Sequence, residues 1–174
     1  MNVIFRATDL LLRNVRHDLG RRHAFAAERV GFISARAAST SNSLLLEAIS
    51  YFPVADVDYV NDRSVGAMMG QEAIRKALNI ALMQKVGVFH VHMHEHKGQP
   101  GFSRTDLREQ AKFIPDFFKV CHQLPHGAIV LSHDQAAGRV WLAPDKIVAI
   151  PEFNVIGNQT VVQKLKSTGW LGFL

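Results

Sequence analysis

Apolar and polar positions along the chain follow two periods, one typical of helices and one typical of strands. Short apolar stretches rich in β-branched residues predict strands at residues 2–7, 28–37, 44–50, 87–94, 127–132, 138–142 and 146–150. Apolar residues at helical spacing predict helices at residues 8–21, 67–84 and 103–113, with Pro115 interrupting or restarting the third. We expect residues 51–57 to extend the third strand past Pro53, and residues 56–65 to form a loop. The alternation of strands and helices predicts an α/β fold with a mixed sheet flanked by helices.

Four histidines alternate with other residues at the end of the predicted strand 87–94. They are His90, His92, His94 and His96. Alternate side chains of a strand share one face, so we expect these histidines to point the same way. Two neighbouring neutral imidazoles can hold one Zn²⁺, with a carboxylate as third ligand and water as the fourth. The pattern therefore predicts a catalytic metal site.

A serine and an aspartate follow the histidines at fixed spacing. Ser103 lies nine positions after His94, and Asp106 lies three positions further on. With His92 and His94 as the pair, this arrangement resembles the JAMM motif of the MPN/JAB1 metalloprotease family. A given residue type occupies a fixed position by chance roughly once in 15 to 20, so over three possible histidine pairs a fortuitous match occurs about once in 100.

An upstream segment carries the same resemblance. Residues 28–33, which read Glu-Arg-Val-Gly-Phe-Ile, resemble the family's Glu-x-x-Gly strand, and a predicted helix precedes them. Residues 67–84 fit the family's second helix. The resemblance covers most of residues 1–150 and implies the MPN fold, a curved, cytidine-deaminase-like mixed sheet flanked by helices. We expect residues 1–157 to form the metalloprotease domain and residues 158–174 a tail that packs on the core or docks a partner.

The resemblance implies a role for each motif residue. His92, His94 and Asp106 would hold Zn²⁺, which lowers the pKa of bound water to about 7. Glu28 would accept the proton of this water and later protonate the leaving amine. Ser103 would donate a hydrogen bond to the oxyanion of the tetrahedral intermediate. The expected reaction is hydrolysis of a peptide or isopeptide bond.

Several of these residues allow a second interpretation. The pattern Ser103-x-x-Asp106 is also typical of a helix N-cap with its capping box, which would present Asp106 to the metal. The family usually has proline where this chain has Glu95, and that carboxylate is expected to face solvent or contact substrate. We expect His90 to support the ligands or pack in the core, and His96 to lie on a loop.

The small bacterial JAB proteins are the family members that the chain most resembles. This implies a ubiquitin-like protein or its conjugates as partner, cut at its C-terminus by a deubiquitinase-like metalloprotease. Residues 51–70 are expected to supply a β-flap that clamps an extended tail by strand addition. The alternatives are a zinc amidase acting on a small molecule or sulfur-carrier adduct, and a non-catalytic MPN scaffold. A cupin-type site would need a later Glu and His within a β-barrel repeat, and that pattern is missing.

Composition and charge indicate what kind of protein this is and which partners to expect. The chain has 174 residues, 48% hydrophobic and 20% charged, as expected for one globular domain. Its net charge of +5 comes without an aromatic RNA-binding motif or helix-turn-helix pattern, so we expect no nucleic-acid partner. We expect a cytoplasmic protein without a membrane partner, because signal-peptide and membrane-spanning patterns are missing. Cys121 is the single cysteine, so any metal must be held by His, Asp or Glu.

Overall fold

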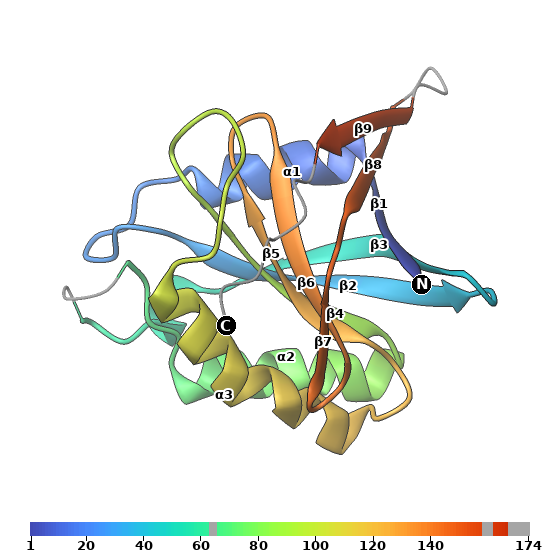
Figure 1. Ribbon diagram of the computed structural model, residues 1–174. Helices are drawn as coiled ribbons and strands as arrows, with labels where there is room; N and C mark the ends of the chain where they lie inside the picture. The colour runs from blue at the N-terminus through green and yellow to red at the C-terminus, as the bar shows by residue number, and fades with distance from the viewer. Residues whose placement is uncertain (63–65, 158–161, 167–174) are drawn as a thin grey trace.

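The computed structural model describes residues 1–62 and 66–157, together with the backbone of 162–166 (Figure 1). Its helices are α1 (Asp9–Leu19), α2 (Gln71–Gln84) and α3 (Arg104–Val120), with one short 3₁₀ helix, η1 (Asp56–Asp58). Its strands are β1 (Asn2–Thr8), β2 (Val30–Ser39), β3 (Ser43–Pro53), β4 (Gly87–Met93), β5 (His126–Leu131), β6 (Ala136–Ala143), β7 (Lys146–Ala149), β8 (Glu152–Ile156) and β9 (Val162–Lys166). The apolar end at residues 170–174, predicted to pack or dock, lies outside the described residues.

All the described strands join one mixed sheet in the order β7-β6-β5-β4-β2-β3-β1-β8-β9. Strand β1 runs parallel to β3 and β8, and β4 runs parallel to β5, whereas the remaining pairs are antiparallel. The sheet is curled, with α1 on one face and α2 and α3 on the other (Figure 1). This confirms the predicted α/β fold with a mixed sheet and flanking helices. No helix in the described ranges is long and apolar enough to cross a membrane.

Strand β4 separates two hydrophobic cores and is buried along its whole length. Phe89, Val91 and Met93 point into the core that α1 covers. Val88, from the other set of alternating positions, packs in the core beneath α2 and α3. The histidines lie an even number of positions after Val88, so their side chains share its face of the strand. The alternation predicted from the sequence therefore places them on the face that α2 and α3 cover.

Gly31 in β2 leaves room for a side chain that connects the sheet to α1. A Cβ added to Gly31 would lie 2.4 Å from the Tyr51 ring, so only glycine lets this ring cross the strand. The Tyr51 hydroxyl then donates a hydrogen bond to Asp18 at 2.7 Å, which holds the end of α1 against β3. Burial and this hydrogen bond raise the pKa of Tyr51 well above its usual value.

Three predicted boundaries were wrong. Helix α3 continues through Pro115; the proline lacks one N–H, but its neighbours Ile114 and Phe117 are fully buried and hold the helix on the sheet. Helix α2 begins at Gln71 instead of residue 67, because the Gly70 N–H bonds to the Asp58 carbonyl in the preceding loop. Strand β3 ends at Pro53 and does not extend beyond it.

Two strands were not predicted. Strand β8 pairs in parallel with β1, and β9 pairs antiparallel with β8. The second of these lies within the segment that was expected to form a tail. Strand β1, the parallel partner of β8, lies at the other end of the sequence, so no local pattern marks that pairing. Strand β9 pairs with its neighbour in sequence, and the prediction of a tail missed it.

Candidate metal centre

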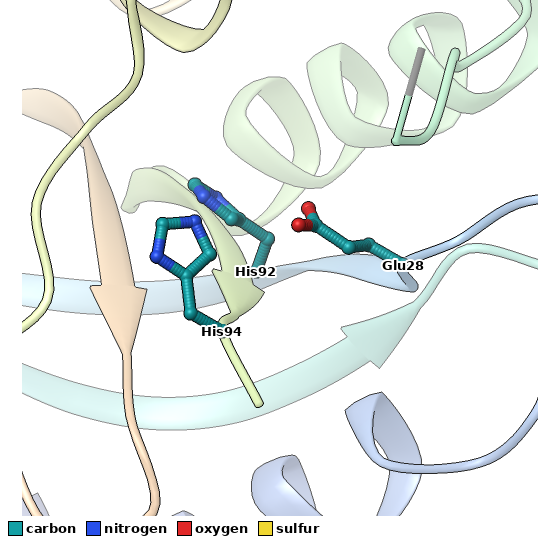
Figure 2. A group of neighbouring side chains, drawn as sticks. All are labelled: Glu28, His92 and His94. Carbon is teal, nitrogen blue, oxygen red and sulfur yellow. The ribbon is translucent and has the colours of Figure 1, made fainter. Parts of the chain in front are cut away.

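Three side chains that could hold a metal ion meet beside the end of β4 (Figure 2). They are Glu28, His92 and His94, whose nearest ligand atoms all lie within 4.8 Å of one another. Strand register explains the meeting: Val30 in β2 pairs with His92 in β4, and the two strands are antiparallel. Glu28 lies two residues before Val30, and His94 lies two residues after His92. Because the strands are antiparallel, the same register brings Glu28 opposite His94. The Glu28 carboxylate points toward the imidazoles (Figure 2).

His92 is the most deeply buried member of this group, and both of its ring nitrogens lack a hydrogen-bond partner among the described residues. A buried imidazole with a free lone pair fits a metal ligand well. His94 is half-buried, and its backbone N–H is held by the Leu131 carbonyl at 2.9 Å. Burial and the neighbouring His92 lower the pKa of His94, which favours the neutral form that binds metal.

Asp106 reaches the site from the first turn of α3. The Ser103 hydroxyl accepts the Asp106 backbone N–H at 3.1 Å, and Asp106 Oδ2 accepts the Ser103 N–H at 2.7 Å, forming a capping box. Oδ2 also lies 3.6 Å from His92 Nε2, slightly longer than a hydrogen bond. Burial alone would raise the pKa of Asp106, but His92 and Ser103 outweigh burial and hold that pKa well below its usual value.

The positions of these side chains agree with part of the predicted assignment of ligands and proton acceptor. His92 and His94 come together as predicted, and Asp106 lies beside His92. Glu28, predicted to be a proton acceptor, lies close enough to both imidazoles to bind the same ion. The converging group thus offers two imidazoles and one carboxylate, that of Glu28, a set that suits Zn²⁺. Asp106, predicted to be the third ligand, is not among the three residues that converge within 4.8 Å and lies 3.6 Å from His92 alone.

The cluster opens into a cavity of about 370 Å³ lined by Ser103, by the charged residues Arg108 and Glu109, and by apolar side chains from several elements. Two buried polar residues, His90 and Gln110, also line this cavity. Sequence reasoning left His90 undecided and missed Gln110, which falls on the inner face of α3 one turn after Asp106. Glu95 does not line the cavity; its side chain is 70% exposed and lies 3.8 Å from His133.

The loop before α2 fixes Glu28 in place. The Glu28 N–H donates to the Gly66 carbonyl at 3.0 Å, and a Cβ on Gly66 would lie 3.3 Å from the Glu28 carboxylate. Next to Glu28, the buried Arg29 guanidinium donates to Asp56 at 2.6 Å and to the Arg21 carbonyl at 3.0 Å. Sequence reasoning missed these contacts, because no local pattern links residues so far apart in the chain.

No protein-family model and no curated protein matches the chain. Among solved structures, the STIL N-terminal domain of Trichoplax adhaerens is similar to it, with a TM-score of 0.40 and 10% sequence identity. The similarity covers 77% of this chain and 40% of that chain. A likeness of this degree assigns neither a family nor an activity.

Proposed function

We propose that the protein is a zinc-dependent peptidase or isopeptidase of the JAMM type, with an MPN fold. The observation that carries this proposal is the meeting of Glu28, His92 and His94 within 4.8 Å, with Asp106 beside His92. These four residues are the acidic and imidazole positions of the motif, and they come from three separate segments of the chain. The curled mixed sheet with α1 on one face and α2 and α3 on the other is consistent with the proposed fold.

Each residue has a proposed role, taken from the motif that it matches. His92, His94 and Asp106 would hold Zn²⁺, which would supply an acidified water molecule and polarise the scissile carbonyl. Glu28, half-buried and hydrogen-bonded through its backbone, accepts a proton and returns it to the leaving amine. The Ser103 hydroxyl oxygen accepts the Asp106 N–H, so its own proton is free to donate to a developing oxyanion.

The proposed substrate is the extended C-terminal tail of a ubiquitin-like protein. Residues 58–62 and 66–70 lie side by side next to the cavity: Tyr59 pairs with Met69, and the Val60 N–H donates to the Met68 carbonyl at 2.9 Å. Met68 and Met69 also line the cavity. A backbone held in this way supports binding of an extended tail by strand addition, and thioether side chains adapt to varied neighbours.

A cleavage assay with Glu28→Gln tests the proposal. The probes are ubiquitin and small bacterial ubiquitin-like proteins that carry a fluorescent amine on the C-terminal carbonyl, with a short acylated amine as the small-amide comparison. We expect zinc-dependent cleavage of a protein probe, and a loss of about 10²- to 10⁴-fold in Glu28→Gln. The matched control, Glu95→Gln, alters an exposed carboxylate outside the cavity and should cleave like the wild type.

Three results would contradict parts of this account. Equal rates for Glu28→Gln and the wild type would exclude Glu28 as the proton acceptor. Loss of zinc from Glu28→Gln would make Glu28 a ligand. Cleavage of the small amide alone would favour the amidase alternative.

A further inference from the structure

A second cavity, of about 200 Å³, lies next to the metal cluster. Its walls are the loop at residues 99–102, Leu107 in α3, and parts of β6 and β7. Phe102 connects the two sites, because it lines this cavity and its ring centroid lies 6.1 Å from that of His92. The proposed peptidase chemistry does not use this cavity.

Arg139 supplies a cation to this cavity. Its Nη1 atom is buried without a hydrogen-bond partner, and no salt bridge to Arg139 occurs within the described ranges. The guanidinium carbon lies 5.0 Å from the centroid of the Trp141 ring, which holds the group from one side. A partly buried guanidinium without a carboxylate is costly, and an anion in the cavity would relieve that cost.

Gln99 supplies a hydrogen-bond acceptor to the same cavity. Its Nε2 donates to the Ala136 carbonyl at 3.3 Å, which fixes the orientation of the side-chain amide. Its Oε1 is then buried with no partner in the described part of the chain. The wall of the cavity therefore includes a cationic side chain without a carboxylate partner and an amide side chain, between apolar side chains that include Pro100, Leu107 and Ile147.

We propose that this cavity binds the C-terminal residue of a peptide. The α-carboxylate pairs with Arg139, the backbone N–H donates to Gln99 Oε1, and an apolar side chain fills the remaining space. Inorganic phosphate satisfies Arg139 but brings no apolar group to fill the remaining space. The assignment uses none of the metal ligands, so it stands or falls independently of the proposed peptidase activity.

An NMR titration with N-acetyl-leucine tests this proposal, with N-acetyl-leucinamide as the uncharged analogue. We expect the acid to shift the side-chain signals of Arg139 and Gln99, and to bind about tenfold or more tightly than the amide. Arg139→Gln should bind acid and amide equally weakly, whereas Arg139→Lys should retain part of the preference. Gln99→Leu should weaken the binding of both compounds.

Arg36→Gln is the matched control, because Arg36 is an exposed arginine on β2 and should leave binding unchanged. Thermal unfolding of every variant checks that the fold is intact. Equal affinity for acid and amide, equal binding by wild type and Arg139→Gln, or no binding of either compound would overturn the proposal. The proposal would also be overturned if inorganic phosphate displaced N-acetyl-leucine and bound as tightly. Such a result would mean that the Gln99 amide and the apolar walls contribute nothing to binding.

Discussion

Asp106 Oδ2 lies 3.6 Å from His92 Nε2 while it accepts the backbone N–H of Ser103 at 2.7 Å. The first turn of α3 and the end of β4 are therefore connected through one carboxylate. The hydrogen bond that starts the helix also orients the acidic residue at the metal cluster. Helix capping and the proposed metal binding both depend on the same short sequence, Ser103-x-x-Asp106.

We predict that Asp106→Asn separates these two consequences. The asparagine carbonyl oxygen can still accept the Ser103 N–H, so the helix start is retained and thermal unfolding changes little. Loss of the negative charge should weaken zinc binding by about 100-fold, as measured by competition with a chelating dye. Unchanged zinc affinity would remove Asp106 from the ligand set.

We predict that Gly66→Ala lowers peptidase activity without loss of zinc. The new Cβ would lie 3.3 Å from the Glu28 carboxylate, which must shift by a few tenths of an ångström. A displaced proton acceptor should reduce kcat by about tenfold, since positioning errors of this kind are costly in catalysis. Gly157→Ala is the control, because a Cβ there meets nothing within 4 Å. Full activity in Gly66→Ala would mean that Glu28 does not require this loop.

We predict that Gln110→Met stabilises the fold. Gln110 is 1% exposed, and neither of its side-chain polar atoms has a hydrogen-bond partner among the described residues. An apolar side chain of similar size removes this desolvation cost, so the free energy of unfolding should rise by about 1 kcal/mol in urea titrations. A loss of stability would instead show that ordered water satisfies the amide.

We predict that His126 makes stability fall in mild acid. Burial lowers its pKa to about 4, although the Cys121 carbonyl favours the charged form. Its Nδ1 accepts the Val88 N–H at 3.1 Å, which leaves the proton on Nε2, facing that carbonyl at 3.0 Å. Between pH 6.5 and pH 4 the unfolded chain binds a proton that the folded chain does not, so stability decreases as the pH falls.

The full effect is about 3 kcal/mol across that window. Urea titrations of metal-free wild type and His126→Gln at several pH values measure it, and the variant should lack this part of the slope. Identical slopes in the two proteins would show that His126 is not the titrating group.

The sequence predicts the meeting of Glu28, His92 and His94 better than it predicts the contacts that surround these residues. The alternation of histidines in β4 indicates a shared face, and Ser103 with Asp106 indicates a capped helix, because both are local patterns. The contact between Gly66 and Glu28 and the pairing of Arg29 with Asp56 join distant segments, and no periodicity marks them. The predicted interruption of the helix at Pro115 was wrong for a related reason. Burial of Ile114 and Phe117 on the sheet outweighs the local helix-breaking effect of the proline.

Zinc content per chain, measured by elemental analysis, tests the central claim most directly. Wild type, His94→Ala and His96→Ala should be compared. His96 is exposed, its Nδ1 lies 2.9 Å from the Lys97 carbonyl, and it is not one of the three residues that could hold the ion. We predict about one zinc per chain in wild type and in His96→Ala, and its loss in His94→Ala. Wild-type protein that holds no zinc when zinc is supplied, or His94→Ala protein that retains it, would contradict the proposed metal centre.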